Sequence, residues 1–186
     1  MSADKKRLFF ALWPEAETRD AISAQTQALV SASGGRAVKP ENLHLTLAFL
    51  HSVETHRLEC IEAAAQRAAC RSVRLQLSKM GYWYRSRILW LAPPAGAVGA
   101  PGTAGSLADA LWAELEVCGF SPERRRFRPH VTLARRAKSV TRPDSMPTIA
   151  WQPRSFVLAE SITGQRQSEY VVLKTFPLRG DSEFSR

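Results

Sequence analysis

The chain has 186 residues, of which 45% are hydrophobic and 23% are charged, a composition typical of a globular protein. Its 26 Lys and Arg residues outnumber its 17 Asp and Glu residues, which gives a net charge of +9 and favours a polyanionic partner such as nucleic acid or a phosphorylated small molecule. No stretch reaches the length of a membrane span, and Pro14 and Glu15 stop the apolar run near the N-terminus below signal-peptide length. We therefore expect a soluble, cytoplasmic protein.

The first half of the chain predicts a strand, a helix and a second strand. Residues 7–13 (RLFFALW) form a β-rich apolar run, and Pro14 then opens a helical stretch that ends at the Gly34-Gly35 pair. After a polar loop comes the strand NLHLTLAFL at residues 42–50.

The second half repeats this order. Residues 87–92 (RILWLA) predict a strand, and Ser106 can cap a helix that stops at Gly119. The strand PHVTLA follows at residues 129–134. The segment 92–106 between the halves is rich in Ala, Gly and Pro, so we interpret it as a mobile surface loop.

The remaining pattern predicts a helix at 52–69, a half-buried strand at 72–79, and two further strands at 156–162 and 170–176 joined by a turn at 164–168. The three cysteines, Cys60, Cys70 and Cys118, are odd in number and lack a Cys-x-x-Cys spacing, so they suggest neither a disulfide framework nor a zinc site. Such cysteines fit a reducing cytoplasm.

Two short motifs, HLTL at 44–47 and HVTL at 130–133, carry the candidate chemistry. Side chains at i and i+2 of a strand share one face, so His44 and Thr46 point the same way, and so do His130 and Thr132. If a pseudo-twofold relates the halves, these faces meet across a cleft.

Such a cleft favours acid and base chemistry on a phosphoester. One imidazole can donate a proton while the other accepts one, and threonine hydroxyls can donate to phosphate oxygens. Neither motif contains a carboxylate, and threonine is a poor ligand for soft metals, so we expect no metal and no cofactor.

At these motifs the chain resembles the two-histidine (2H) phosphoesterases, and within them the RNA 2′,3′-cyclic phosphodiesterases, historically called 2′-5′ RNA ligases. The resemblance extends to RLFFAL, NLHLTLAFL, the RSRILWL run at 85–91, and Pro129 and Arg135. It implies an α+β fold that is bilobal and pseudo-symmetric, with two antiparallel sheets flanking a central cleft and helices packed outside. Residues 1–178 would form this single bilobal domain, and 179–186 a flexible tail.

The resemblance also implies hydrolysis of a terminal ribose 2′,3′-cyclic phosphate to a 2′-phosphate without metal. By analogy His44 would donate a proton to the departing 3′ oxygen and His130 would activate water, although the duplication lets the two exchange roles. Thr46 and Thr132 would hold phosphate oxygens. Arg135 would do the same if a bulge or the strand end releases it, because strict alternation from His130 points it at the core.

Several alternatives stay open at this stage. The basic run 124–128 either grips an RNA backbone or is a solvated surface, and Tyr82, Trp83 and Tyr84 either stack on a base or belong to the core. The resemblance aligns Tyr170 with an aromatic near the cleft, whereas His51 and His56 lack the threonine and suit the surface.

The predicted partner is RNA or an oligonucleotide with a 2′,3′-cyclic phosphate end, bound by a monomer without membrane association. The substrate could also be a 2′-5′ linked oligonucleotide or a small cyclic nucleotide, and ligation could be a side reaction. The rival hypothesis is a non-catalytic RNA-binding module that retains the fold.

Overall fold

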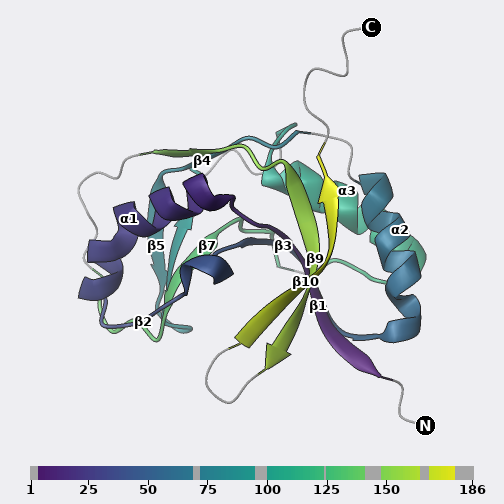
Figure 1. The fold of residues 1–186 in the computed structure, drawn as a ribbon, viewed down its shortest axis with the longest axis horizontal. Coiled ribbons are helices and arrows are strands. Elements are labelled where there is room, and N and C mark those ends of the chain that lie inside the picture. The colour runs from purple at the N-terminus through teal and green to yellow at the C-terminus, as the bar shows by residue number, and fades with distance from the viewer. Residues whose placement is uncertain are drawn as a thin grey trace, which may run out of the picture.

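The computed structural model describes residues 4–68, 72–94, 100–123, 125–140, 148–163 and 168–178. The fold is α+β, as expected, with helices α1 (Ala16–Ala32), α2 (Leu58–Ala68) and α3 (Ala104–Leu115) packed on antiparallel strands (Figure 1). Residues 95–99 of the expected loop, residues 164–167 of the turn expected at 164–168, and the expected tail at 179–186 lie outside the described residues.

Within the described residues, eight strands form one antiparallel sheet in the order β10-β9-β1-β3-β7-β6-β5, with β2 paired to β7. These strands are β1 (Lys5–Leu12), β2 (Arg36–Ala37), β3 (Leu45–Glu54), β5 (Lys79–Trp83), β6 (Ile88–Ala92), β7 (Val131–Arg135), β9 (Ser155–Thr163) and β10 (Ser168–Pro177). β4 (Leu75–Leu77) and β8 (Ile149–Trp151) form a separate pair. The two expected sheets are thus the two halves of the larger one, which a single residue pair joins between β3 and β7.

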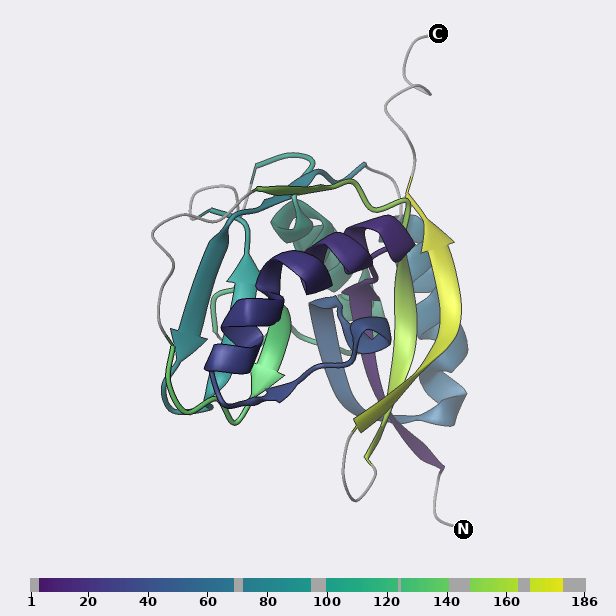
Figure 2. The ribbon, with the colours of Figure 1, turned by 60° about the vertical axis from the view of Figure 1, so that its left-hand side comes forward.

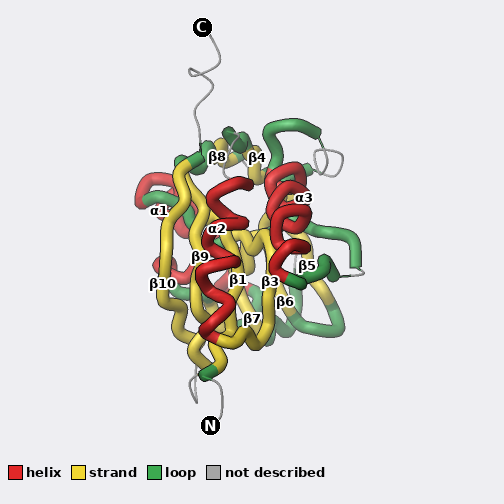
Figure 3. Tube along the Cα trace, turned by 90° about the vertical axis from the view of Figure 1, so that its right-hand side faces the viewer, coloured by secondary structure: helices red, strands yellow, loops and turns green. Residues whose placement is uncertain are grey.

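The helices divide between the two halves of the sheet. α1 packs against β7, β2 and β8 (Figure 2), whereas α2 and α3 lie side by side over the half that contains β3 and β10 (Figure 3). None of the described helices has the length and apolar character needed to span a bilayer.

Strand β1 lies between β3 and β9, and from Leu8 to Leu12 its side chains are buried on both faces of the sheet. Leu8, Phe10 and Leu12 belong to the main core, whereas Phe9 and Ala11 face the other side and form a second buried cluster with residues of β9. The face of the sheet opposite the main core therefore has a small hydrophobic cluster of its own.

Two helix starts differ from the sequence expectation. β3 continues to Glu54 and the short 3-10 helix η2 (Thr55–Arg57) follows, so the helix expected from residue 52 begins only at Leu58. The N-cap of α3 is Thr103 rather than Ser106: the Ser106 N–H donates to Thr103 Oγ1 at 3.3 Å, and the Thr103 N–H donates to Ser106 Oγ at 3.2 Å. Ser106 therefore closes the capping box from within the helix instead of opening the helix.

The other predicted elements are present with small changes. α3 tightens into the 3-10 helix η3 (Glu116–Cys118) and stops at Gly119, whose φ is 74°, as the glycine predicts. The strand expected at 72–79 is two strands, β4 and β5, in different sheets, and the expected polar loop before His44 contains β2 and the 3-10 helix η1 (Pro40–Asn42).

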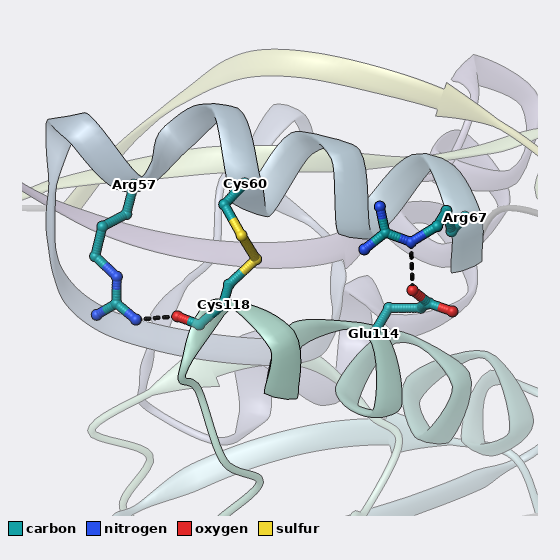
Figure 4. Close-up of a disulfide and its surroundings, with 5 residues drawn as sticks. All are labelled: Arg57, Cys60, Arg67, Glu114 and Cys118. Atoms are coloured by element: carbon teal, nitrogen blue, oxygen red, sulfur yellow. Dashed lines mark hydrogen bonds and ion pairs between the residues drawn. A yellow bond between two sulfur atoms is a disulfide. The ribbon is translucent and has the colours of Figure 1, made fainter.

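The cysteine expectation is wrong, because Cys60 and Cys118 form a disulfide with their Cα atoms 5.9 Å apart (Figure 4). The two residues are 58 positions apart in sequence, and they meet because α2 and α3 pack side by side. Arg57 reinforces the same junction: its guanidinium donates to the Cys118 carbonyl and lies 4.0 Å from the centre of the Phe120 ring.

We predict that Cys60→Ser or full reduction destabilises the oxidised protein by about 4 kcal/mol, the chain-entropy value for a loop of this size. The measurement is urea unfolding with and without dithiothreitol. The reductant should lower the stability of the wild type and leave Cys60→Ser unchanged. Equal stability of the oxidised wild type and the variant would contradict the prediction.

Candidate functional site

The two histidine motifs meet where β3 and β7 touch. Leu45 pairs with Val131 in antiparallel register, and both side chains are fully buried in the main core. Continuing this register by one residue in each direction sets His44 opposite Thr132 and Thr46 opposite His130. All four side chains therefore point away from the main core, on the face of the sheet that we call the motif face. A twofold axis through the Leu45 and Val131 pair relates one motif to the other.

Both motifs carry the same bulge. In the β1 and β3 pair, Ala11 faces Thr46 and Phe10 faces Ala48, so Leu47 is skipped. In the β6 and β7 pair, Trp90 faces Thr132 and Leu89 faces Ala134, so Leu133 is skipped. A bulge reverses the alternation beyond it, and the fifth residue after each histidine therefore returns to the motif face.

Those fifth residues are Phe49 and Arg135, and both line a cavity of about 370 Å³ on this face. His44, Thr46 and Thr132 also line it. The bulge thus releases Arg135 from the core-facing position that strict alternation predicts. Residues from β1, β2, the segment before β3, β9 and β10 complete the wall: Arg7, Phe9, Arg36, Ala37, Val38, Lys39, Asn42, Ser161 and Tyr170.

Aromatic rings surround His44. The Trp13 ring stacks on it with centroids 5.0 Å apart and planes 20° apart, and Tyr170 presents an edge at 5.0 Å. Phe9 lies 5.2 Å away beneath it. Trp13 is itself held because its Nε1 donates to the Glu41 carbonyl at 3.0 Å. These contacts fix the plane of the imidazole and shield part of it from water, since His44 is half-buried.

His130 is not among the residues that line the cavity, but it lies beside it. Its ring meets Trp83 edge to face at 4.5 Å, and Trp83 packs on Trp90 at 5.6 Å. Gly81 makes room for this stack, since the Trp90 ring occupies the space that a Cβ at position 81 would need. A series of aromatic contacts thus supports each histidine from its own half of the sheet.

Both imidazoles are oriented in the same way by the backbone. His44 Nδ1 lies 2.8 Å from the Asn42 carbonyl oxygen, and His130 Nδ1 lies 2.7 Å from the Arg128 carbonyl oxygen. A carbonyl oxygen only accepts, so each Nδ1 carries the hydrogen and donates. In the neutral ring the lone pair is then on Nε2, which accepts a proton, and the same atom donates once the ring is charged.

The surroundings disfavour a charged imidazole in the free protein. Burial lowers the pKa of His44 to about 4, partly opposed by the bond to Asn42, and the charges of Arg135 and His130 lower it further. Burial also lowers the pKa of His130, the Arg128 carbonyl opposes this, and Arg135 adds to the lowering. Arg135 therefore lies within electrostatic reach of both rings.

The remaining candidates divide between this face and the surface. Trp83 contacts His130, Tyr82 donates from its hydroxyl to the Ala137 carbonyl at 2.8 Å, and Tyr84 is 84% exposed, so the three aromatics neither all stack nor all join the core. His51 and His56 are exposed, as expected.

The basic run before His130 is exposed at Arg125, Arg126 and Arg128, whereas Phe127 packs on the core. Position 124 lies outside the described residues.

Sequence reasoning missed Arg7, Arg36, Lys39 and Trp13. A basic residue pair between the end of a helix and the histidine strand was the available signal for Arg36 and Lys39, but this segment resembles an ordinary polar loop. Nothing periodic marks Trp13, which follows the end of β1. Within the described part of the chain, no three His, Cys, Asp or Glu side chains gather in a group that could hold a metal ion.

The chain is similar to proteins of known family over most of its length. The model of the 2′-5′ RNA ligase superfamily matches residues 18–163. Curated relatives named RNA 2′,3′-cyclic phosphodiesterase include one from Escherichia coli (strain K12), 32% identical over 95% of this chain and 98% of its own length. Another, from Thermus thermophilus, is 32% identical over 94% of this chain and 91% of its own length.

Solved structures give the same result. The crystal structure of E. coli LigT complexed with 3′-AMP superposes with a TM-score of 0.83 at 31% identity, covering 95% of this chain and all of the other. The crystal structure of TT0787 of Thermus thermophilus superposes with a TM-score of 0.74 at 28% identity, covering 94% of this chain and 99% of the other. Together with the family match over residues 18–163, these similarities show that the chain belongs to the 2′-5′ RNA ligase superfamily.

Proposed function

We propose that this protein is an RNA 2′,3′-cyclic phosphodiesterase that opens a terminal ribose 2′,3′-cyclic phosphate to a 2′-phosphate. The observation that carries the proposal is the antiparallel pairing of Leu45 with Val131, which sets two histidines and two threonines on one face beside a cation-lined cavity. Relatives of this chain are named for this reaction, and E. coli LigT has been crystallised with 3′-AMP and with phosphate.

The two Nε2 atoms divide the proton transfers between them. His130 accepts a proton from water as the water oxygen attacks phosphorus, and the bond between phosphorus and O3′ breaks. His44 donates a proton to the departing O3′, which becomes a hydroxyl, and the phosphate stays on O2′. This division of roles follows the family resemblance, and the twofold relation of the motifs makes the reverse division geometrically equivalent.

Three further side chains would hold the phosphate. The hydroxyls of Thr46 and Thr132 donate to its non-bridging oxygens, and the guanidinium of Arg135 offsets the negative charge that grows in the transition state. The lowered pKa of His44 then has a functional counterpart: a bound phosphate places a negative charge beside the ring, which favours the imidazolium and raises its pKa in the complex.

One chain supplies both motifs, which supports action as a monomer. We place the reaction in the cytoplasm, where reductants would keep Cys60 and Cys118 as thiols, in contrast to the bonded pair of the structure. The stability difference between oxidised and reduced protein therefore matters for handling the enzyme and not for the proposed chemistry.

His44→Ala and His130→Ala should each lower kcat by about 100-fold to 10,000-fold, the contribution typical of a general acid or base. The assay follows adenosine 2′,3′-cyclic phosphate with excess EDTA, in which the wild type keeps its activity. His56→Ala is the matched control because that exposed ring lies outside the site. A wild type that binds RNA in a salt-sensitive way without any turnover would favour the non-catalytic binding module instead.

The rate should depend on pH as a bell, since one ring must be neutral and the other charged. Because burial lowers both pKa values in the free protein, both limbs of kcat/KM should lie below the ordinary histidine pKa of 6.5, whereas bound phosphate should move the basic limb of kcat to higher pH. Replacing either histidine should abolish the bell in the residual activity. A profile that keeps both limbs without His44 or His130 would contradict the roles assigned here.

Unfolding measurements test the environment of His44 without substrate. Above pH 6.5 the ring is neutral in both states, and between pH 6.5 and about 4 only the unfolded chain takes up the proton, so stability falls as the pH falls. Between pH 7 and pH 4 the wild type should lose on the order of 3 kcal/mol more than His44→Gln. His56→Gln should follow the wild type, and a His44→Gln curve parallel to it would refute the buried environment.

A further inference from the structure

The cavity beside the histidines is chemically polarised. Phe9, Phe49 and Tyr170 line it on the side of β1, β3 and β10. Arg36 and Lys39 line it on the side of β2 and the segment that leads to β3. The proposed reaction assigns no role to Arg36 or Lys39.

The edge that carries Arg36 is held firmly against β7. Gly34, with φ of 59°, turns the chain after α1, and Gly35 lies so close to the end of β7 that a Cβ there would come 3.0 Å from the Arg135 carbonyl oxygen and 2.9 Å from the Ala137 Cα. The Val38 N–H donates at 2.8 Å to the carbonyl of Leu133, the residue that the bulge displaces. β2 lies beside β7 (Figure 2), and the Val38 hydrogen bond that follows β2 fastens this edge to the same bulge that exposes Arg135.

This attachment places like charges directly opposite each other. Arg36 pairs with Arg135 in antiparallel register, so the two guanidinium side chains leave the same face of neighbouring strands. A phosphate oxygen between the two guanidinium groups can accept charge-assisted hydrogen bonds from both. Lys39 adds a third charge, and its contact with Glu41 at 3.9 Å is an exposed pair that competes weakly with a ligand.

We propose that Arg36 and Lys39 bind the phosphodiester that joins the terminal nucleotide to its 5′ neighbour, while the cyclic phosphate lies between the histidines and Arg135. This subsite rests on the proposed function, and its ligand is the anionic backbone of an oligoribonucleotide of two or more residues. A lone cyclic nucleotide carries one negative charge and would leave these cations without a phosphate.

The subsite fixes the direction in which a bound RNA strand leaves the cavity. Within the described residues, β3 pairs with β1 and β7 but with no short strand like β2, so the half that contains β3 has no counterpart of the Arg36 and Arg135 pair. An RNA strand that uses Arg36 therefore leaves the site on the β2 side, which breaks the symmetry of the two motifs.

The test compares two dinucleotides that end in a 2′,3′-cyclic phosphate. Both are ApA, one with the natural phosphodiester and the other with an uncharged methylphosphonate between the nucleosides. The wild type should show kcat/KM about tenfold higher for the natural linkage, the value of one charge-assisted hydrogen bond. Arg36→Gln and Lys39→Gln should each reduce this ratio, the double variant should bring it close to one, and Arg36→Lys should restore part of it.

Two controls separate this subsite from its neighbours. Arg135→Gln should slow both substrates and keep their ratio, because it acts on the reacting phosphate. Lys79→Gln, an exposed cation at the far end of β5, should change neither rate. Raising the salt concentration should lower the wild-type ratio more than that of the double variant.

A wild-type ratio near one, or a ratio that both variants leave intact, would overturn the subsite while hydrolysis itself continued. Equal slowing of both dinucleotides by Arg36→Gln would overturn it as well, because Arg36 would then bind the reacting phosphate. A wild type that opens neither cyclic phosphate would overturn the proposed function and the subsite together.

Discussion

A single backbone pairing, Leu45 with Val131, sets the relative position of the two histidines and two threonines on the motif face. Both side chains are fully buried, so the hydrophobic core fixes which face of each strand points away from it. Sliding one strand by a single residue would turn its histidine and threonine into the core and its leucines outward, at the cost of burying polar groups. The burial that stabilises the fold therefore also holds the two motifs, which are distant in sequence, with each histidine opposite the threonine of the other motif.

The duplicated bulge extends this arrangement beyond the motifs. Leu47 and Leu133 are skipped at the same place in each half, yet the residues released by the two bulges differ, since one is Phe49 and the other Arg135. The two halves thus share the backbone geometry of the bulge, but only one of them places a charged side chain there. Arg7 lies 5.4 Å from the Phe49 ring centre, so on that side a cation reaches the cavity across an aromatic ring instead of from the bulge itself.

The sequence predicts the local part of this structure well and the long-range part poorly. Alternation in HLTL and HVTL places His44 and His130 with their threonines correctly, because a strand has a fixed period of two. The same rule misplaces Arg135 unless a bulge is allowed, and the bulge depends on pairing with β6, which no local pattern encodes. β2 and the disulfide were missed for the same reason: two residues gain strand geometry only from β7, and Cys60 meets Cys118 only when α2 packs on α3.

The asymmetry between the halves bears on the division of proton transfers. Two rings related by a twofold, each donating from Nδ1 to a carbonyl two residues earlier, have no intrinsic reason to act differently. Their surroundings differ, because three aromatic rings enclose His44 whereas Trp83 borders His130. A substrate anchored at the β2 edge by its 5′ phosphodiester would present O3′ to one ring and the attacking water to the other. The direction of the RNA strand, rather than the histidines themselves, would then decide which ring is the acid.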